Sequence, residues 1–168
     1  RKSSQSPRIR SHFQLMANKD TSDLGSPSKE FFWDFQGHSC YAEVSEPNKA
    51  DPKKPIALLI HGFACSTVYW RETRAYLNDA GYTVHSVDLL GQGKSSKPTR
   101  KDNVEYSIDL WAKMVDEYAD RYMDLGESGV VLVGNSLGSV VALSAATGDC
   151  YSNDADSSKQ PYLSSRVK

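Results

Sequence analysis

The segment from residue 130 to residue 147 constrains the fold of this chain more than any other stretch. Four apolar residues, 130–133, precede a turn sequence that contains Gly134, Ser136 and Gly138, and mostly small and apolar residues follow. This pattern predicts a short buried strand, a sharp turn and a helix. A serine between two glycines in that setting is the G-x-S-x-G arrangement of a nucleophile elbow, which lifts the hydroxyl clear of the backbone. Glycine is expected on both sides because a Cβ there would collide with the neighbouring strand or helix.

This segment has two other interpretations. Ser136 could be merely a small residue that caps the helix at a crowded junction. The stretch 130–147 also approaches the minimum length of a membrane span. Polar residues and glycines at 134–136 and 138–139 interrupt it, so a strand followed by a buried helix explains it better. We therefore predict no transmembrane segment.

Strand and helix patterns alternate before the elbow and predict an α/β domain. Alternating apolar residues at 31–35 and 40–44, on either side of a Gln-Gly turn, indicate a β-hairpin. The continuous apolar run at 56–60 is typical of a strand inside a parallel sheet. Further predicted elements are a helix from Ser66 to Gly81, a strand over 83–87, and a helix capped by Ser107 whose apolar stripe reaches Leu125. This order gives a mostly parallel sheet with flanking helices.

The residues that follow the strand at 56–60 predict a second part of the site. They are His61, Gly62 and Phe63. Acyl transfer needs backbone N–H donors where the tetrahedral oxyanion forms, and we expect these from Phe63 and from Leu137, the residue after the serine. His61 is interpreted as a brace of its loop, since nothing in its sequence context makes it the general base.

Other classes of function are disfavoured. The glycine that a P-loop requires five residues before Gly93 is replaced by Asp88, and Pro98 interrupts the helix that should follow. A net charge of −1 gives no field that would attract nucleic acid. Three widely spaced cysteines form neither a disulfide framework nor a zinc site. We therefore predict no cofactor, no metal and no nucleic-acid partner.

With these motifs in place, the chain resembles the α/β-hydrolase family. The resemblance is carried by residues 61–63 after one strand, 88–95 after the next and 134–138 after the third, and it covers roughly residues 30–148. Residues 32–37 and 88–95 are also similar to chloroplast and cyanobacterial members, pheophytinase-like hydrolases among them. The resemblance implies carboxylester hydrolysis by a serine nucleophile on a small-molecule ester or acyl substrate. Perhydrolase or acyltransferase chemistry on the same scaffold stays open, whereas dehalogenases of this fold use Asp at the elbow.

The resemblance also implies a general base and an acid after the serine, and about three more strands. All four histidines, His12, His38, His61 and His85, precede Ser136. We therefore expect an incomplete α/β-hydrolase fold that lacks its C-terminal strands and is inactive or weakly active. The alternative is a non-catalytic remnant that binds a ligand or pairs with a partner. The uncovered outer edge of the strand at 130–133 would favour self-association.

The expected boundaries divide the chain into three parts. Residues 1–29 are expected to be disordered or transit-like, since basic residues and serines dominate the first 19 positions and acids are absent there. Residues 30–148 are expected to form the truncated domain, and 149–168 a disordered tail unrelated to it. This composition suggests a chloroplast or other organelle, with the cytoplasm as the alternative.

Overall fold

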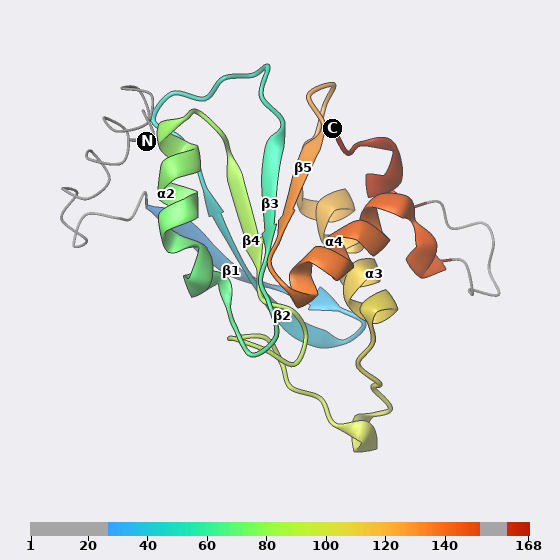
Figure 1. Cartoon of the computed structure of the whole chain (residues 1–168). Helices are drawn as coiled ribbons and strands as arrows, with labels where there is room; N and C mark the ends of the chain where they lie inside the picture. Colours follow the sequence, from blue (N-terminus) through green and yellow to red (C-terminus); the bar gives the residue numbers. More distant parts are fainter. Residues whose placement is uncertain (1–26, 152–160) are drawn as a thin grey trace, which may run out of the picture.

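The computed structural model describes residues 27–151 and 161–168. The expected transit-like segment, residues 1–29, lies almost entirely outside the described residues. The described elements form one sheet with helices on both faces (Figure 1). This arrangement confirms the predicted α/β class.

The predicted hairpin is formed by β1, Ser28–Phe35, and β2, His38–Ser45. Its register pairs Phe35 with His38 across a two-residue turn. Both turn residues, Gln36 and Gly37, have positive φ angles, of 53° and 81°. Tight turns of this kind match the twist of the strands that they join.

The hairpin and the parallel strands form one mixed sheet. In the described part of the chain its strand order is β1-β2-β4-β3-β5, with β3 at Ile56–Ile60, β4 at Val84–Val87 and β5 at Val130–Gly134. β3 pairs in parallel with both β4 and β5, whereas β2 pairs antiparallel with β4. The hairpin thus adds an antiparallel edge to a parallel centre. The carboxyl ends of β3, β4 and β5 meet at one end of the sheet.

The helices cover opposite faces of this sheet (Figure 1). α2, Arg71–Asp79, lies on one face, and α3, Ile108–Tyr122, and α4, Leu137–Thr147, lie on the other. Side chains of β3 alternate between the two: Ala57 and Leu59 pack with Trp70, while Leu58 and Ile60 join the larger cluster beneath α3 and α4. Burial on both faces explains the continuous apolar run of β3.

The two predicted helix caps have different outcomes. Ser107 caps α3 as expected, its Oγ accepting a hydrogen bond from the Leu110 N–H at 3.1 Å. Ser66 instead precedes a short 3-10 helix, η2 at Thr67–Trp70, which comes before α2, and its side chain makes no cap hydrogen bond. A further 3-10 helix, η3 at Arg100–Asp102, lies in the loop before α3. Among the described residues, no helix combines the length and apolar character that crossing a membrane requires.

The described parts of segment 149–168 pack on the domain, which differs from the expectation of a disordered tail. They form two 3-10 helices, η4 at Asp149–Tyr151 and η5 at Leu163–Ser165, and Leu163 is fully buried. The Asp116 carboxylate on α3 accepts hydrogen bonds from the Tyr162 N–H at 3.2 Å and the Leu163 N–H at 2.8 Å. The segment is held by hydrogen bonds to one buried acid on a distant helix and not by an apolar run of its own. The sequence of the segment therefore gave no sign of this packing. Residues 152–160 lie outside the described part, and the boundary at 148 stays a prediction.

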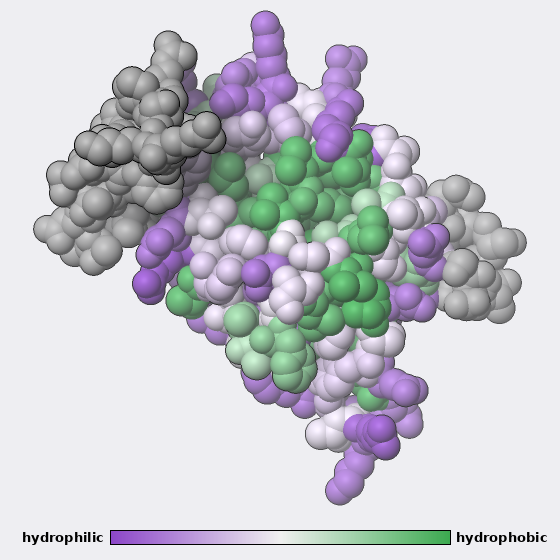
Figure 2. Space-filling model, in the orientation of Figure 1, coloured by the Kyte–Doolittle hydropathy of each residue, from purple (hydrophilic) through white to green (hydrophobic). Residues whose placement is uncertain are grey.

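The surface carries exposed hydrophobic side chains on the side of β3, β5 and α4. Figure 2 shows them gathered on the face that is turned towards the viewer. On α4, Val140 is 52% exposed and Leu143 is 65% exposed. Patches of this kind indicate surfaces that another segment or molecule covers.

Candidate active site

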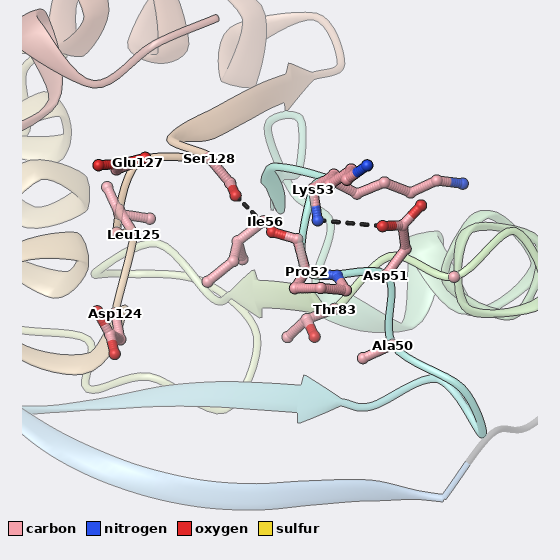
Figure 3. A pocket seen from close by; sticks show the side chains of 13 residues that line it. Ala50, Asp51, Pro52, Lys53, Ile56, Thr83, Asp124, Leu125, Glu127 and Ser128 are labelled. Atoms are coloured by element: carbon pink, nitrogen blue, oxygen red, sulfur yellow. Dashed lines mark hydrogen bonds between the residues drawn. The ribbon is translucent and has the colours of Figure 1, made fainter.

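The two ends of the parallel strands carry different features. At the amino ends, a cavity of about 610 Å³ lies between the loops that precede β3, β4 and β5, with Pro52, Ile56, Thr83 and Ser128 among its lining residues (Figure 3). The elbow lies at the opposite, carboxyl end. Ligands of parallel α/β sheets bind outside the carboxyl ends of the strands, so the candidate site is at the elbow and not in this cavity.

The elbow has the predicted strand–turn–helix form. β5 ends at Gly134 and α4 begins at Leu137, so Ser136 occupies the turn between them. Ser136 has a φ of 52° and a ψ of −117°, and the residue is exposed to solvent. A backbone of this kind costs a non-glycine residue about 1–3 kcal/mol and is concentrated at functional sites. The expected strained, accessible serine is present in the structure.

Both elbow glycines are required by close approach. A Cβ on Gly134 would lie 2.4 Å from the Gly138 carbonyl oxygen, and a Cβ on Gly138 would lie 2.1 Å from the Ile60 carbonyl oxygen. Backbone atoms cannot move aside as a flexible side chain can. The start of α4 therefore packs directly on the end of β5 and β3.

The loop after β3 lies against the same turn. The Asn135 N–H donates to the Ile60 carbonyl at 3.1 Å. A Cβ built on Gly62 would lie 2.9 Å from Asn135 Oδ1 and 3.3 Å from Ser136 Cβ. The structure thus brings together the two segments that the sequence separates by more than 70 residues.

The two expected oxyanion donors are unpaired within the described residues. Neither the Phe63 N–H nor the Leu137 N–H donates a hydrogen bond to another described residue. The neighbouring amides are engaged: Ala64 N–H donates to Gln92 Oε1 at 2.6 Å, and Gly138 N–H donates to the Asn135 carbonyl at 2.8 Å. Leu137 is also the first residue of α4, where the helix dipole favours negative charge.

His61 is held inside the loop and is not placed as a base for Ser136. The side chain is fully buried, its Nδ1 lies 2.7 Å from the Gly62 carbonyl, and its Nε2 accepts from the Leu89 N–H at 3.1 Å. An accepting Nε2 requires a neutral ring that donates from Nδ1. Burial lowers the pKa of His61, which agrees with that neutral form. These contacts are those of a brace for the loop.

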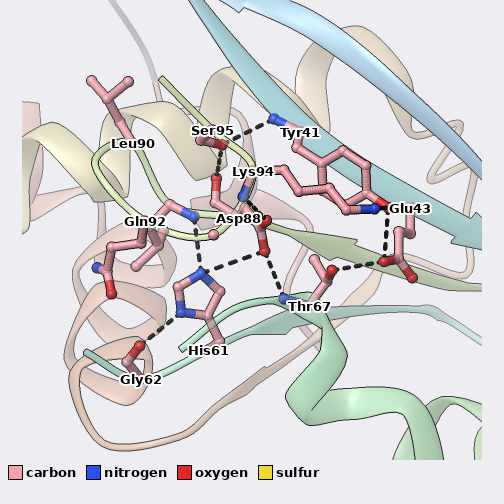
Figure 4. A network of polar contacts seen from close by, with 12 residues as sticks. Tyr41, Glu43, His61, Gly62, Thr67, Asp88, Leu90, Gln92, Lys94 and Ser95 are labelled. Carbon is pink, nitrogen blue, oxygen red and sulfur yellow. Dashed lines mark hydrogen bonds and ion pairs between the residues drawn. The ribbon is translucent and has the colours of Figure 1, made fainter. Parts of the chain in front are cut away.

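Asp88 anchors both loops around the site (Figure 4). It is fully buried at the end of β4, and its carboxylate accepts from the Thr67 N–H at 2.6 Å and the Lys94 N–H at 2.7 Å. Its backbone carbonyl accepts from Ser95 Oγ at 2.7 Å. Sequence reasoning used Asp88 only to reject a P-loop and did not assign it this role. A carboxylate directly after a buried strand was the available signal.

A second buried carboxylate continues this network towards the hairpin. Glu43 on β2 accepts from Thr67 Oγ1 at 2.7 Å and from Tyr41 Oη at 3.0 Å, and it forms an ion pair with Arg74 on α2. Lys94 Nζ in turn donates to Tyr41 Oη at 2.9 Å. The network ties the sheet, η2 and the loop after β4 together beneath the site.

The described residues place no general base or metal at the serine. No hydrogen bond joins a described histidine to Ser136. His85 lies inside β4, where its Nδ1 is 2.9 Å from Tyr118 Oη, and burial lowers its pKa to about 4. Within the described ranges, no three His, Cys, Asp or Glu side chains gather as a metal ion would require.

Comparisons with known proteins identify the family to which the chain is similar. A family model described as alpha/beta hydrolase fold matches residues 55–147. The chain is 32% identical over 114 residues to the probable lysophospholipase BODYGUARD 3 of Arabidopsis thaliana, a match that covers 66% of this chain and 22% of that protein. It is 34% identical over 92 residues to bifunctional epoxide hydrolase 2 of Sus scrofa, covering 55% of this chain and 16% of the relative.

Solved structures give the same result. The thioesterase domain from the curacin biosynthetic pathway matches with a TM-score of 0.58 and 26% identity, over 73% of this chain and 43% of that one. A membrane phospholipase A matches with a TM-score of 0.58 and 26% identity, over 83% and 42%. The chain thus spans less than half of each of these four proteins. Closeness to pheophytinase-like hydrolases stays a prediction, but with the family model matching more than half of its residues, the chain belongs to the α/β-hydrolase fold family.

Proposed function

We propose that this chain carries the nucleophile and the oxyanion hole of a serine hydrolase that acts on carboxylesters. The observation that carries the proposal is the exposed, strained Ser136 beside the N–H groups of Phe63 and Leu137, which have no hydrogen-bond partner within the described part of the chain. An alcohol nucleophile next to two free backbone donors is the constellation that acyl transfer requires.

In the proposed reaction, Ser136 Oγ adds to the carbonyl carbon of the ester. The electron pair of the carbonyl moves to its oxygen, and the N–H groups of Phe63 and Leu137 stabilise the resulting oxyanion. Each such donor contributes about 3 kcal/mol to the transition state. Collapse of the adduct expels the leaving oxygen, which takes up a proton from solvent water in place of the one that Ser136 released to it and departs as the alcohol. The acyl-serine that remains is then hydrolysed by water.

The proton of Ser136 needs an acceptor, and the described residues place no histidine to take it. We therefore expect slow turnover from this chain by itself. Enzymes that lose a triad member retain a rate about 10³–10⁴-fold above that in water, because the oxyanion hole still acts.

The comparisons support an acyl substrate without identifying it. Three of the named relatives are called lysophospholipase, thioesterase and phospholipase A, whereas a fourth is called an epoxide hydrolase. A serine at the elbow favours the acyl class, because its alkoxide forms an ester with an acyl group. We propose a small-molecule ester as the substrate.

Labelling with a fluorophosphonate probe tests the proposal. We expect Ser136 to be labelled slowly, because the described residues place no base beside it, and the Ser136→Ala variant not to be labelled at all. Ser139→Ala is the matched control, because Ser139 is an exposed serine on the first turn of α4 and its loss should leave labelling unchanged. A folded chain without labelling, or labelling that survives Ser136→Ala, contradicts the proposed function.

A second proposal concerns the partner-pairing alternative and rests on the outer edge of β5. Val130 pairs there with the tail: its N–H donates to the Arg166 carbonyl at 2.9 Å, and its carbonyl accepts from the Lys168 N–H at 3.0 Å. Among the described residues, no hydrogen bond reaches the outward backbone groups of Leu132. We propose that a second copy of the chain pairs along this edge.

Light scattering over a range of concentrations tests the pairing. We expect a dimer that Leu132→Lys weakens, because a charged residue on an edge strand opposes strand addition. Val140→Lys, a charge on the exposed face of α4, is the control. A monomer at every concentration contradicts the proposal.

Organelle targeting by residues 1–29 also remains a proposal, with the cytoplasm as the alternative. It rests on their basic, serine-rich composition. Fusion of these residues to a fluorescent protein tests it, and diffuse cytoplasmic fluorescence would contradict it.

A further inference from the structure

The loop that carries Phe63 contains a second strained residue, Ala64. Its φ is 56°, in the left-handed region that a residue with a Cβ avoids. The residue is exposed, so packing of its methyl group does not hold it there. Within the loop, the Cys65 N–H donates to the Gly62 carbonyl at 3.3 Å and closes a turn with Phe63 and Ala64 at its centre. A contact from outside the loop adds to the hold on this conformation.

Gln92 makes that contact. Its Oε1 accepts a hydrogen bond from the Ala64 N–H at 2.6 Å, across 28 positions of the chain. The Gln92 backbone is fixed on both sides, since its N–H donates to the Leu89 carbonyl at 2.9 Å and its carbonyl accepts from the Ser95 N–H at 3.1 Å. Figure 4 shows Gln92 in the loop that the Asp88 carboxylate anchors.

The amide nitrogen of Gln92 indicates that this side chain is not present for stability alone. Gln92 is only 8% exposed, and its buried Nε2 has no hydrogen-bond partner among the described residues. A buried donor without a partner destabilises a fold. Local features that reduce stability without compensation are expected at functional sites.

We propose that Gln92 is a positioning residue of the oxyanion hole. It holds Ala64 in the left-handed conformation, and this keeps the preceding Phe63 amide beside Ser136 and free to bind an oxyanion. The inference rests on the proposed function, because it assigns Gln92 a part in the same site.

A double-mutant cycle between Gln92 and Ala64 tests the role. The measured quantity is the second-order rate of fluorophosphonate labelling of Ser136. Gln92→Met keeps the side-chain length but removes the acceptor, and we expect it to slow labelling about tenfold. The reason is that a residue with a Cβ, once released, populates the left-handed region about tenfold less than its other conformations. In an Ala64→Gly background the same change should slow labelling less than about threefold, because glycine adopts this φ without penalty.

Two further variants separate positioning from folding. Gln92→Asn keeps the amide but withdraws its oxygen by one methylene, and it should slow labelling as Gln92→Met does. Lys101→Met, on the exposed η3, is the control and should label at the normal rate. Amide hydrogen exchange at Ala64 should become faster in both Gln92 variants, while their melting temperatures stay close to that of the unmodified chain.

The outcomes distinguish the proposed function from the positioning role of Gln92. No labelling of the folded, unmodified chain overturns the proposed function, and the role of Gln92 with it. Normal labelling of the unmodified chain together with undiminished labelling of both Gln92 variants overturns the positioning role alone. An equal loss with Ala and with Gly at position 64 also overturns it.

Discussion

Replacing Asp88 by asparagine is expected to destabilise the fold by several kcal/mol. Asp88 is fully buried, and its two carboxylate oxygens each accept one backbone hydrogen bond, from Thr67 at 2.6 Å and from Lys94 at 2.7 Å. Asparagine has a single acceptor oxygen. One of the two N–H groups would therefore face the NH₂ group of the new side chain and lose its partner.

The magnitude follows from these contacts. A hydrogen bond to a charged group contributes about 1.5–3 kcal/mol, and a buried donor left unpaired costs about 1–3 kcal/mol more. The sum is about 4 kcal/mol, a large part of the 5–15 kcal/mol that stabilises a typical domain. At about 3 °C per kcal/mol for a domain of this size, the melting temperature should fall by about 12 °C.

Thermal unfolding followed by circular dichroism is the assay. Asp102→Asn is the matched control: the Asp102 carboxylate accepts from the Thr99 N–H at 2.7 Å, but this cap is exposed to water. Its melting temperature should change by no more than about 2 °C. If Asp88→Asn melts within about 3 °C of the unmodified chain, the carboxylate does not anchor the loops and the reasoning is refuted.

Three other predictions follow from single residues. Burial lowers the pKa of His85 to about 4, so the unfolded chain binds its proton first, and stability should fall by up to about 3 kcal/mol as the pH drops from about 6.5 towards 4. In the His85→Gln variant, the free energy of unfolding measured with urea should depend less on pH between about 6.5 and 4. An unchanged pH dependence would contradict the lowered pKa of His85. Ser136→Gly removes the penalty of a positive φ and should raise the melting temperature by about 3 °C while abolishing labelling; a lower melting temperature would show that the elbow is not strained. Asp116→Ala removes the acceptor of the Leu163 N–H, so exchange of that amide should accelerate about 100-fold with the β3 amides unchanged, and continued protection of Leu163 would refute the docking of the tail.

Several parts of the site could be predicted because their signals are local. The elbow sequence, the apolar run of β3 and the serine cap of α3 each encode their structure within a few residues. The step between distant segments came from chemistry, since acyl transfer needs backbone N–H donors beside the serine. For this reason the sequence alone predicts the loop containing Phe63 beside Ser136.

Other parts had no such signal. A glutamine between two glycines in a polar loop is typical of solvent exposure, yet Gln92 is buried and bonded to Ala64. The segment around Leu163 lacks an apolar run, yet it packs on Asp116, 47 positions away. Neither contact alters the periodicity of the sequence, so pattern reasoning could not find it.

The amino-acid sequence by itself determined the α/β class, the position of the candidate nucleophile and the two loops that meet it, since hydrophobic periodicity and glycine placement act over short distances. Only the tertiary structure decided which side chains hold those loops in place, how the hairpin made the sheet mixed and how the tail covers part of the β5 edge. The physical reason is that these features depend on hydrogen bonds and packing between residues far apart in the chain. Such contacts form only when the whole sheet has assembled.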